Sequence, residues 1–151
     1  MRSYLRGRPS GGLLEAAARS RARSGFEGFV ELHRAQYGMY ARARLQAAGP
    51  AAEVVAWTFG YVEAGWDEVL GGPEPTAVCW SLLRGAVSRR TEVGRPAADW
   101  LHEVLPAAAA DVVLLRYRLG LDLPAAARLM GVSVGVVEVE LRAALRILAR
   151  A

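Results

Sequence analysis

The chain has 151 residues, of which 53% are hydrophobic, and this length permits one compact domain or two small ones. All 19 basic residues are Arg, a bias typical of a GC-rich genome, and the formal net charge is +4. A single Cys excludes an intrachain disulfide, and without a long apolar run the sequence predicts no membrane span. We therefore expect a cytoplasmic protein with a substantial hydrophobic core.

The positive charge is concentrated at the amino terminus. Residues 1–24 contain six Arg and one Glu, for a net charge of +5, whereas residues 25–151 contain 13 Arg and 14 acidic residues, for −1. Because Gly, Ser and Pro are interspersed among these Arg, we predict that residues 1–24 form a basic flexible arm, with a short helix over 13–19 as an option. The arm is either simply solvated or contacts phosphate or an acidic partner.

Three helices are predicted in residues 25–90 from apolar side chains at helical spacing. We expect them at 26–48, 51–70 and 75–90, because Gly and Pro residues follow each of the first two stretches. Such helices can bury their apolar faces against one another in a small bundle. The aromatic residues of the second helix are then either part of the core or exposed to hold separated DNA strands.

Residues 91–98 contain Gly and Pro and are predicted to be a short linker to a second helical module at 99–151. Asp99 is expected to cap a short first helix, which Pro106 ends. A longer helix follows at 107–119. Further on, Asp122 is the expected cap of the next helix, which carries a proline in its first turn.

The end of the chain has the spacing of a helix-turn-helix. Ala127 supplies a small residue for close helix crossing, Gly131 tolerates positive φ in the turn, and Val137 points back into the core. Ser133 is the predicted cap of a final helix over 134–150. A plain helical hairpin would satisfy the same spacing.

The chain carries no motif for catalysis or for metal binding. His33 and His102 lie far apart in sequence, and no pair of Cys or His has metal-ligand spacing. Cys79 is better explained as a small buried residue than as a nucleophile. We therefore expect no enzymatic activity, no metal and no cofactor.

The helix-turn-helix segment resembles region 4 of the extracytoplasmic-function (ECF) sigma factors of bacteria, which reads the promoter −35 element. The similarity begins at Leu105–Pro106, continues through the stretch VVLLRYRLG, and includes the turn Met130-Gly131-Val132-Ser133. Residues 135–137 occupy the place of the family's Gly-Thr-Val. This resemblance covers about 50 residues of the chain.

The first half resembles region 2 of the same family, which grips RNA polymerase and melts the −10 element. The stretch FVELHRAQYGMYARARL is similar to the first helix of region 2. The family signature of the second helix is matched by Ala51, Val55, Thr58 and Phe59. The order of the two regions is also that of the family.

The resemblance implies an all-α fold of two small modules: a three-helix, region 2-like bundle at 25–90 and a region 4-like helix-turn-helix at 99–151. It implies core RNA polymerase and promoter DNA as partners, with an anti-sigma factor as a further option. It assigns DNA contact to Ser133, Glu138, Glu140, Arg142, Arg146 and Arg150. It assigns polymerase contact to Glu53, Val54 and Phe59.

The final helix departs from the family at the positions that approach DNA. The family has Lys, Ser and Arg where this chain has Glu138, Val139 and Glu140, and a carboxylate repels phosphate, although it can accept a hydrogen bond from cytosine. The remaining Arg142, Arg146 and Arg150 either contact phosphates or form a solvated face with a Glu138–Arg142 pair. Two other functions therefore stay open: a sigma-fold interaction module that has lost −35 reading, and an ordinary helix-turn-helix regulator that uses its basic arm.

Overall fold

The structure is a computed structural model that describes residues 11–92 and 99–150, and all regular elements within these ranges are helical. The predicted all-α class is confirmed. The elements in chain order are α1 (Gly11–Leu45), α2 (Ala48–Ala64), α3 (Trp66–Gly71), α4 (Pro75–Glu92), α5 (Leu101–Val104), α6 (Ala107–Val113), the π-helical turn η1 (Leu114–Arg118), α7 (Leu123–Met130) and α8 (Val134–Ala149). No helix in the described part is long and apolar enough to cross a membrane.

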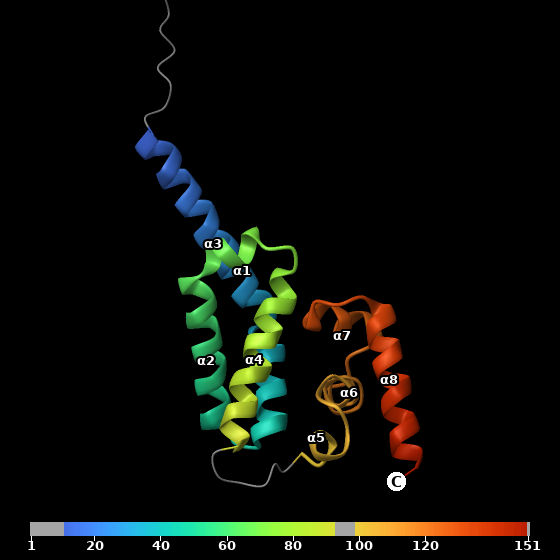
Figure 1. The fold of residues 1–151 in the computed structure, drawn as a ribbon. Helices are drawn as coiled ribbons and strands as arrows, with labels where there is room; N and C mark the ends of the chain where they lie inside the picture. Colours follow the sequence, from blue (N-terminus) through green and yellow to red (C-terminus); the bar gives the residue numbers. More distant parts are fainter. Residues whose placement is uncertain (1–10, 93–98, 151) are drawn as a thin grey trace, which may run out of the picture.

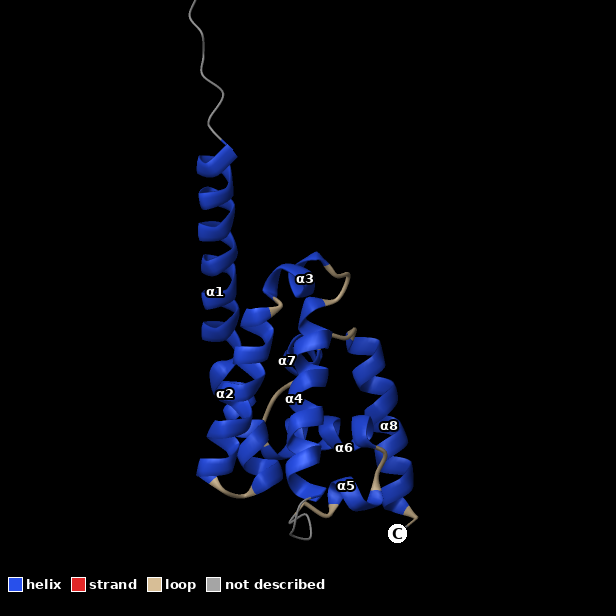
Figure 2. Ribbon diagram, turned by 60° about the vertical axis from the view of Figure 1, so that its left-hand side comes forward, coloured by secondary structure: helices blue, strands red, loops and turns tan. Residues whose placement is uncertain are grey.

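Helices α1, α2 and α4 run side by side and form a bundle, with the short α3 across one end (Figures 1 and 2). Aromatic rings fill the space between these helices. Tyr37 of α1 stacks on Phe59 of α2 with ring centroids 5.5 Å apart, and Trp80 of α4 lies against Tyr40 at 4.6 Å. The apolar spacing that predicted three packed helices is therefore satisfied by burial of large rings at their common interface.

The start of the first helix differs from the prediction. Residues 11–24 are the first turns of α1 rather than a flexible arm, and α1 projects well beyond the bundle (Figures 1 and 2). Ala, Leu and Arg are strong helix formers, and a helix already present from residue 26 extends into such a stretch without a new nucleation step. Residues 1–10, the remainder of the predicted arm, lie outside the described residues.

Several other helix boundaries also differ from the prediction. The first helix ends at Leu45, and the second begins at Ala48, which places Pro50 in its first turn, where the missing N–H costs nothing. The stretch predicted as one helix over 51–70 is divided at Gly65 into α2 and α3. Most of the predicted linker, residues 93–98, lies outside the described residues.

The carboxyl-terminal half consists of α5 to α8, with α6 packed against both α5 and α8 (Figure 1). The helix predicted at 107–119 is present as α6 and the π-helical turn η1. The hydrophobic side chains that the carboxyl-terminal half buries are small or aliphatic rather than aromatic. They include Leu105, Ala109, Ala110, Val112, Leu114, Leu115, Ala126, Leu129, Val137 and Ala144.

The two halves pack directly against each other, and their buried residues form one continuous core. Helix α7 contacts α4, and η1 contacts α1. At Gly131 the approach is so close that an added Cβ would lie 2.3 Å from the backbone nitrogen of Ala77 at the start of α4. The turn between α7 and α8 is thus seated on the amino-terminal bundle.

Candidate nucleic-acid interface

Helices α7 and α8 form a helix-turn-helix whose local geometry follows the predicted signals. The Asp122 carboxylate accepts a hydrogen bond of 2.8 Å from the Ala125 N–H, and the Ser133 hydroxyl accepts one of 3.3 Å from the Val136 N–H. Gly131 ends α7 in the left-handed conformation with φ of 71°. Ala127 and Val137 are buried, as the spacing argument required.

Helix α8 turns Val137 and Ala144 toward the core and exposes the opposite face. Arg142, Arg146 and Arg150 are all exposed, and their four-residue spacing places them along one stripe. Ser133, at the amino end of the helix, is exposed as well. The structure therefore gathers these four predicted DNA-contacting residues on the outside of one helix.

The two acidic residues of α8 differ in position. Glu138 is exposed, whereas Glu140 is half-buried at the edge of the core-facing side. Within the described α8 no ion pair joins Glu138 to Arg142, so the solvated-face alternative lacks the pair that it invoked. The arginine stripe is therefore not neutralised by that neighbour.

Apolar side chains are also exposed on α8. Val136 and Val139 near its amino end are 45% and 62% exposed, and Leu145 and Ile147 follow toward its carboxyl end. Val139 lies among the arginines on the outer face, and the others flank it. The helix thus offers a mixed apolar and cationic surface rather than a purely basic one.

The residues predicted to contact polymerase differ in their accessibility to solvent. Val54 and Phe59 are only 4% and 8% exposed, because their side chains fill the contact of α2 with the rest of the bundle. Glu53 is exposed and pairs with Arg90 of α4. Matching residues to a family signature does not separate side chains that shape a helix from those that meet a partner.

The exposed face of α2 instead carries two aromatic residues. Trp57 and Tyr61 are 45% and 58% exposed, and their rings stack with centroids 5.4 Å apart. The Arg89 guanidinium of α4 lies over the Trp57 ring, 5.4 Å from its centroid. Trp66, at the start of α3, is buried. The surface formed by Glu53, Trp57, Tyr61, Arg89 and Arg90 is called the α2 patch below.

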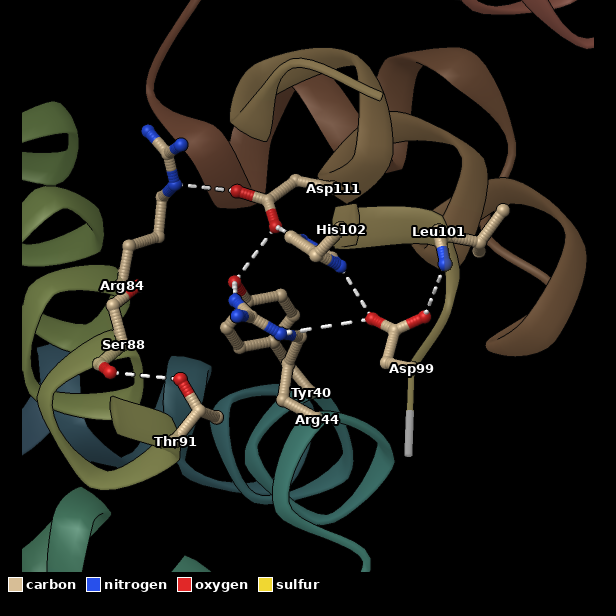
Figure 3. Close-up of polar contacts among 9 residues, drawn as sticks. All are labelled: Tyr40, Arg44, Arg84, Ser88, Thr91, Asp99, Leu101, His102 and Asp111. Carbon is tan, nitrogen blue, oxygen red and sulfur yellow. Dashed lines mark hydrogen bonds and ion pairs between the residues drawn. The ribbon is translucent and has the colours of Figure 1, made fainter. Parts of the chain in front are cut away.

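A buried polar cluster lies between the two halves (Figure 3). We call it the interface network, and its members are Tyr40 and Arg44 of α1, Arg84 of α4, Asp99 just before α5, His102 of α5 and Asp111 of α6. Asp99 and Asp111 are almost completely shielded from solvent, at 1% and 0% exposure. Buried carboxylates require partners of opposite charge, and the cluster supplies them from three helices, α1, α4 and α5.

The two carboxylates hold the network together. Asp111 accepts a hydrogen bond of 2.7 Å from the Tyr40 hydroxyl, contacts His102 Nε2 at 2.7 Å and pairs with Arg84. Asp99 contacts His102 Nδ1, lies 3.6 Å from Arg44 Nε and accepts a hydrogen bond from the Leu101 N–H. Burial by itself would raise the pKa of Asp99, but its contacts with His102 and Arg44 outweigh burial and hold it below the ordinary value.

Sequence reasoning did not identify this network. The sequence predicts only a capping role for Asp99, and it indicates of His102 only that it lies far from His33. One signal was available in Asp111, a lone carboxylate within the apolar run AAAADVVLL. No group of His, Cys, Asp or Glu side chains in the described residues is arranged to hold a metal ion, this cluster included.

The fold and the capped α7–α8 pair define a helix-turn-helix protein. Residues 100–148 match the family model described as sigma-70, region 4. The match covers α5 to α7 and nearly all of α8, and α1 to α4 lie outside it. No curated protein matches the chain significantly. Residues 100–148 are therefore similar to a sigma-70 region 4 module, as the resemblance predicted, and this match supports a sigma-factor-like role in transcription.

Proposed function

We propose that this protein is an ECF-like sigma factor that binds core RNA polymerase and directs promoter recognition in bacterial transcription initiation. The observation that carries the proposal is the region 4 match over residues 100–148, joined to a bundle whose sequence resembles region 2. Promoter DNA would lie along α8. The protein would act without catalytic residues of its own, by positioning polymerase.

The arginine stripe of α8 supports contact with DNA phosphates. Arg142, Arg146 and Arg150 project from the face opposite Val137 and Ala144, so they can reach a duplex without disturbing the core. Each phosphate neutralised by a basic side chain releases counterions, and binding then weakens as salt increases. The Ser133 hydroxyl and the first N–H groups of α8 add uncharged donors at the amino end of the helix, whereas the arginines lie in its carboxyl-terminal half.

The α2 patch supports contact with polymerase. It combines two exposed aromatic rings with arginine side chains, the residue types that contribute most to protein interfaces. We assign polymerase contact to Glu53, Trp57 and Tyr61. We assign to the buried Val54 and Phe59 the packing of α2 against the rest of the bundle.

The experiment is transcription from fragmented genomic DNA by core polymerase of a GC-rich bacterium, with and without the purified protein. Mapped RNA ends should cluster at sites that share one promoter sequence. The double variant Arg142→Ala/Arg146→Ala should lose these transcripts, and each lost phosphate contact should lower the salt slope of DNA binding by about 1. Arg34→Ala, an exposed arginine of α1, is the matched control and should retain them.

A second function is favoured by the exposed valines and by Glu138 on α8. In this alternative the protein keeps the sigma fold, has lost −35 reading, and binds a protein partner such as polymerase or an anti-sigma factor. Binding to core polymerase without a DNA shift at low salt would select this alternative. Replacing Glu138 and Glu140 by Lys should then increase DNA affinity if α8 still faces the duplex, because two repulsive charges become attractive.

A further inference from the structure

We propose that the interface network is a pH-sensitive latch, which holds α5 to α8 against α1 and α4 while His102 is protonated and releases them when His102 loses its proton. The proposal concerns the arrangement of the two halves and does not depend on DNA binding. It follows from the position of one imidazole ring between two buried carboxylates.

The geometry requires a charged imidazole. His102 Nδ1 faces Asp99 and His102 Nε2 faces Asp111 at 2.7 Å, so each ring nitrogen has a carboxylate oxygen opposite it. A neutral imidazole carries only one N–H, and its other nitrogen would then present a lone pair to a carboxylate. Both contacts are favourable only in the imidazolium form.

Every other charged group of the network is committed to these carboxylates. Arg44 reaches Asp99 from α1, and Arg84 pairs with Asp111 from α4. The Tyr40 hydroxyl donates to Asp111 and accepts a 2.9 Å hydrogen bond from Arg44. Since Tyr40, Arg44 and Arg84 belong to one half while Asp99 and Asp111 belong to the other, the network spans the contact between the halves (Figure 3).

The remaining contacts across this boundary explain why a change at His102 matters. They include α7 against α4, where Gly131 meets the backbone at Ala77, and η1 against α1. A buried ion network that loses a partner is strongly destabilised, because the remaining charges keep the cost of desolvation. Loss of the His102 proton leaves one ring nitrogen with a lone pair facing a carboxylate, and this unfavourable contact lies at the boundary between the halves.

The direction of the pH effect follows from the contacts of His102. Burial tends to lower its pKa, but the hydrogen bonds to Asp111 and Asp99 outweigh burial and raise the pKa above the ordinary value of 6.5. We call the molecule with the intact network the closed form. Protonated His102 stabilises the closed form fully at pH values below the pKa that His102 has once the halves are released. This stabilisation is lost as pH rises through the higher pKa that His102 has in the closed form. His33, also near α7, has the opposite sign, because burial lowers its pKa.

The first test uses the unmodified chain with 15N-labelled histidine. Nuclear magnetic resonance should show both His102 nitrogens protonated at pH 6.5 and one titration above it, whereas His33 should titrate below it. Spectra of His33→Phe assign the two signals, since the chain has only two His. A neutral His102 at pH 6.5 would overturn the proposal.

The second test measures the distance between the halves in the full chain. Spin labels go on Ala56→Cys of α2 and Ala149→Cys of α8, both exposed positions outside the network. Native Cys79 is kept, because it is buried and its thiol pKa is raised to about 11, and labelling of the unmodified chain checks that it does not react. Pulsed electron spin resonance from about pH 6 to pH 9 should show a longer distance that grows by at most about tenfold in population per pH unit.

Two variants separate a latch from a merely structural cluster. His102→Gln should show the longer distance at every pH, with no pH dependence. Glu103→Gln, next to it and exposed, should behave as the unmodified chain. Circular dichroism measures helix content and therefore identifies a variant that has unfolded instead of opened. The pH series on the unmodified chain tests the latch without any variant. Distances that stay constant across the pH range in the unmodified chain would refute the latch.

Discussion

The two halves of this molecule bury different kinds of side chains. In the bundle of α1 to α4, rings pack on rings, as in the Tyr37–Phe59 stack and the contact of Phe29 with Trp66 at 5.7 Å. Among the described residues, every ring–ring contact belongs to this half. In α5 to α8 the core consists of Leu, Val, Ala and Met.

This difference changes how each half is specified. Small aliphatic side chains let helices cross closely, and the crossing is then fixed by turns and caps that act over three or four residues. Large rings instead find partners on other helices, and the same amphipathic spacing is compatible with several pairings. The region 4 module is therefore recognisable from local signals, while the bundle depends on contacts between distant residues.

The largest effect is expected at Gly131, where the turn between α7 and α8 packs against the backbone of α4. Gly131→Ala should lower the free energy of unfolding by about 3 kcal/mol or more, because positive φ and a clash with Ala77 act together. Gly120 has nearly the same φ, 72°, but open space around it, so Gly120→Ala should cost only about 1–2 kcal/mol. Urea unfolding of the pair measures the difference. Equal losses of unfolding free energy in the two variants would show that the contact of the Gly131 turn with α4 does not contribute to stability.

Two tyrosines of α1 sharpen the comparison between the bundle and the contact of the halves. Tyr40→Phe removes a donor to buried Asp111 and should cost about 1–3 kcal/mol. The buried Tyr37 hydroxyl has no hydrogen-bond partner in the described structure, so Tyr37→Phe should be neutral or slightly stabilising. Both variants keep the ring and its packing. Thermal or urea unfolding of both gives the comparison, and a costly Tyr37→Phe would contradict it.

Acid should weaken the ring-packed bundle through His33. Burial lowers the pKa of His33 below 6.5, so the bundle is stabilised by the neutral ring and loses this contribution as pH falls below 6.5. His33→Phe, which keeps a ring against Phe29 and Tyr37, should flatten the pH dependence of the free energy of unfolding just below pH 6.5. Parallel slopes for the two proteins in urea titrations would exclude this role.

The smallest effect is expected at the surface of the bundle. The Glu53–Arg90 pair is exposed, with side chains 69% and 44% accessible, so Glu53→Gln should cost at most about 0.2–1 kcal/mol and less in high salt. The same exposure makes the residue available to a partner. If Glu53→Gln loses polymerase binding but keeps its stability, Glu53 contacts the partner and contributes little to the fold. A large loss of stability would contradict the assignment of Glu53 to polymerase contact.

The sequence by itself determined the features that depend on neighbouring residues. The all-α class, the caps Asp122 and Ser133, and the left-handed Gly131 follow from hydrogen bonds and φ preferences within one turn of helix. The exposed arginine stripe followed from helical spacing alone. Composition alone predicts a flexible arm for residues 11–24, because Gly, Ser and Arg are interspersed there, but attachment to a helix makes these residues the first turns of α1.

Only the tertiary structure decided which side chains are available. Val54 and Phe59 are buried while Trp57 is exposed, although all lie on one helix, because the positions of α1 and α4 define the buried face of α2. The interface network likewise joins residues as far apart as Tyr40 and Asp111, 71 positions along the chain. The contact arises only once both halves have folded and packed. No local pattern encodes it, because the energetic requirement for partners exists only where packing has excluded water.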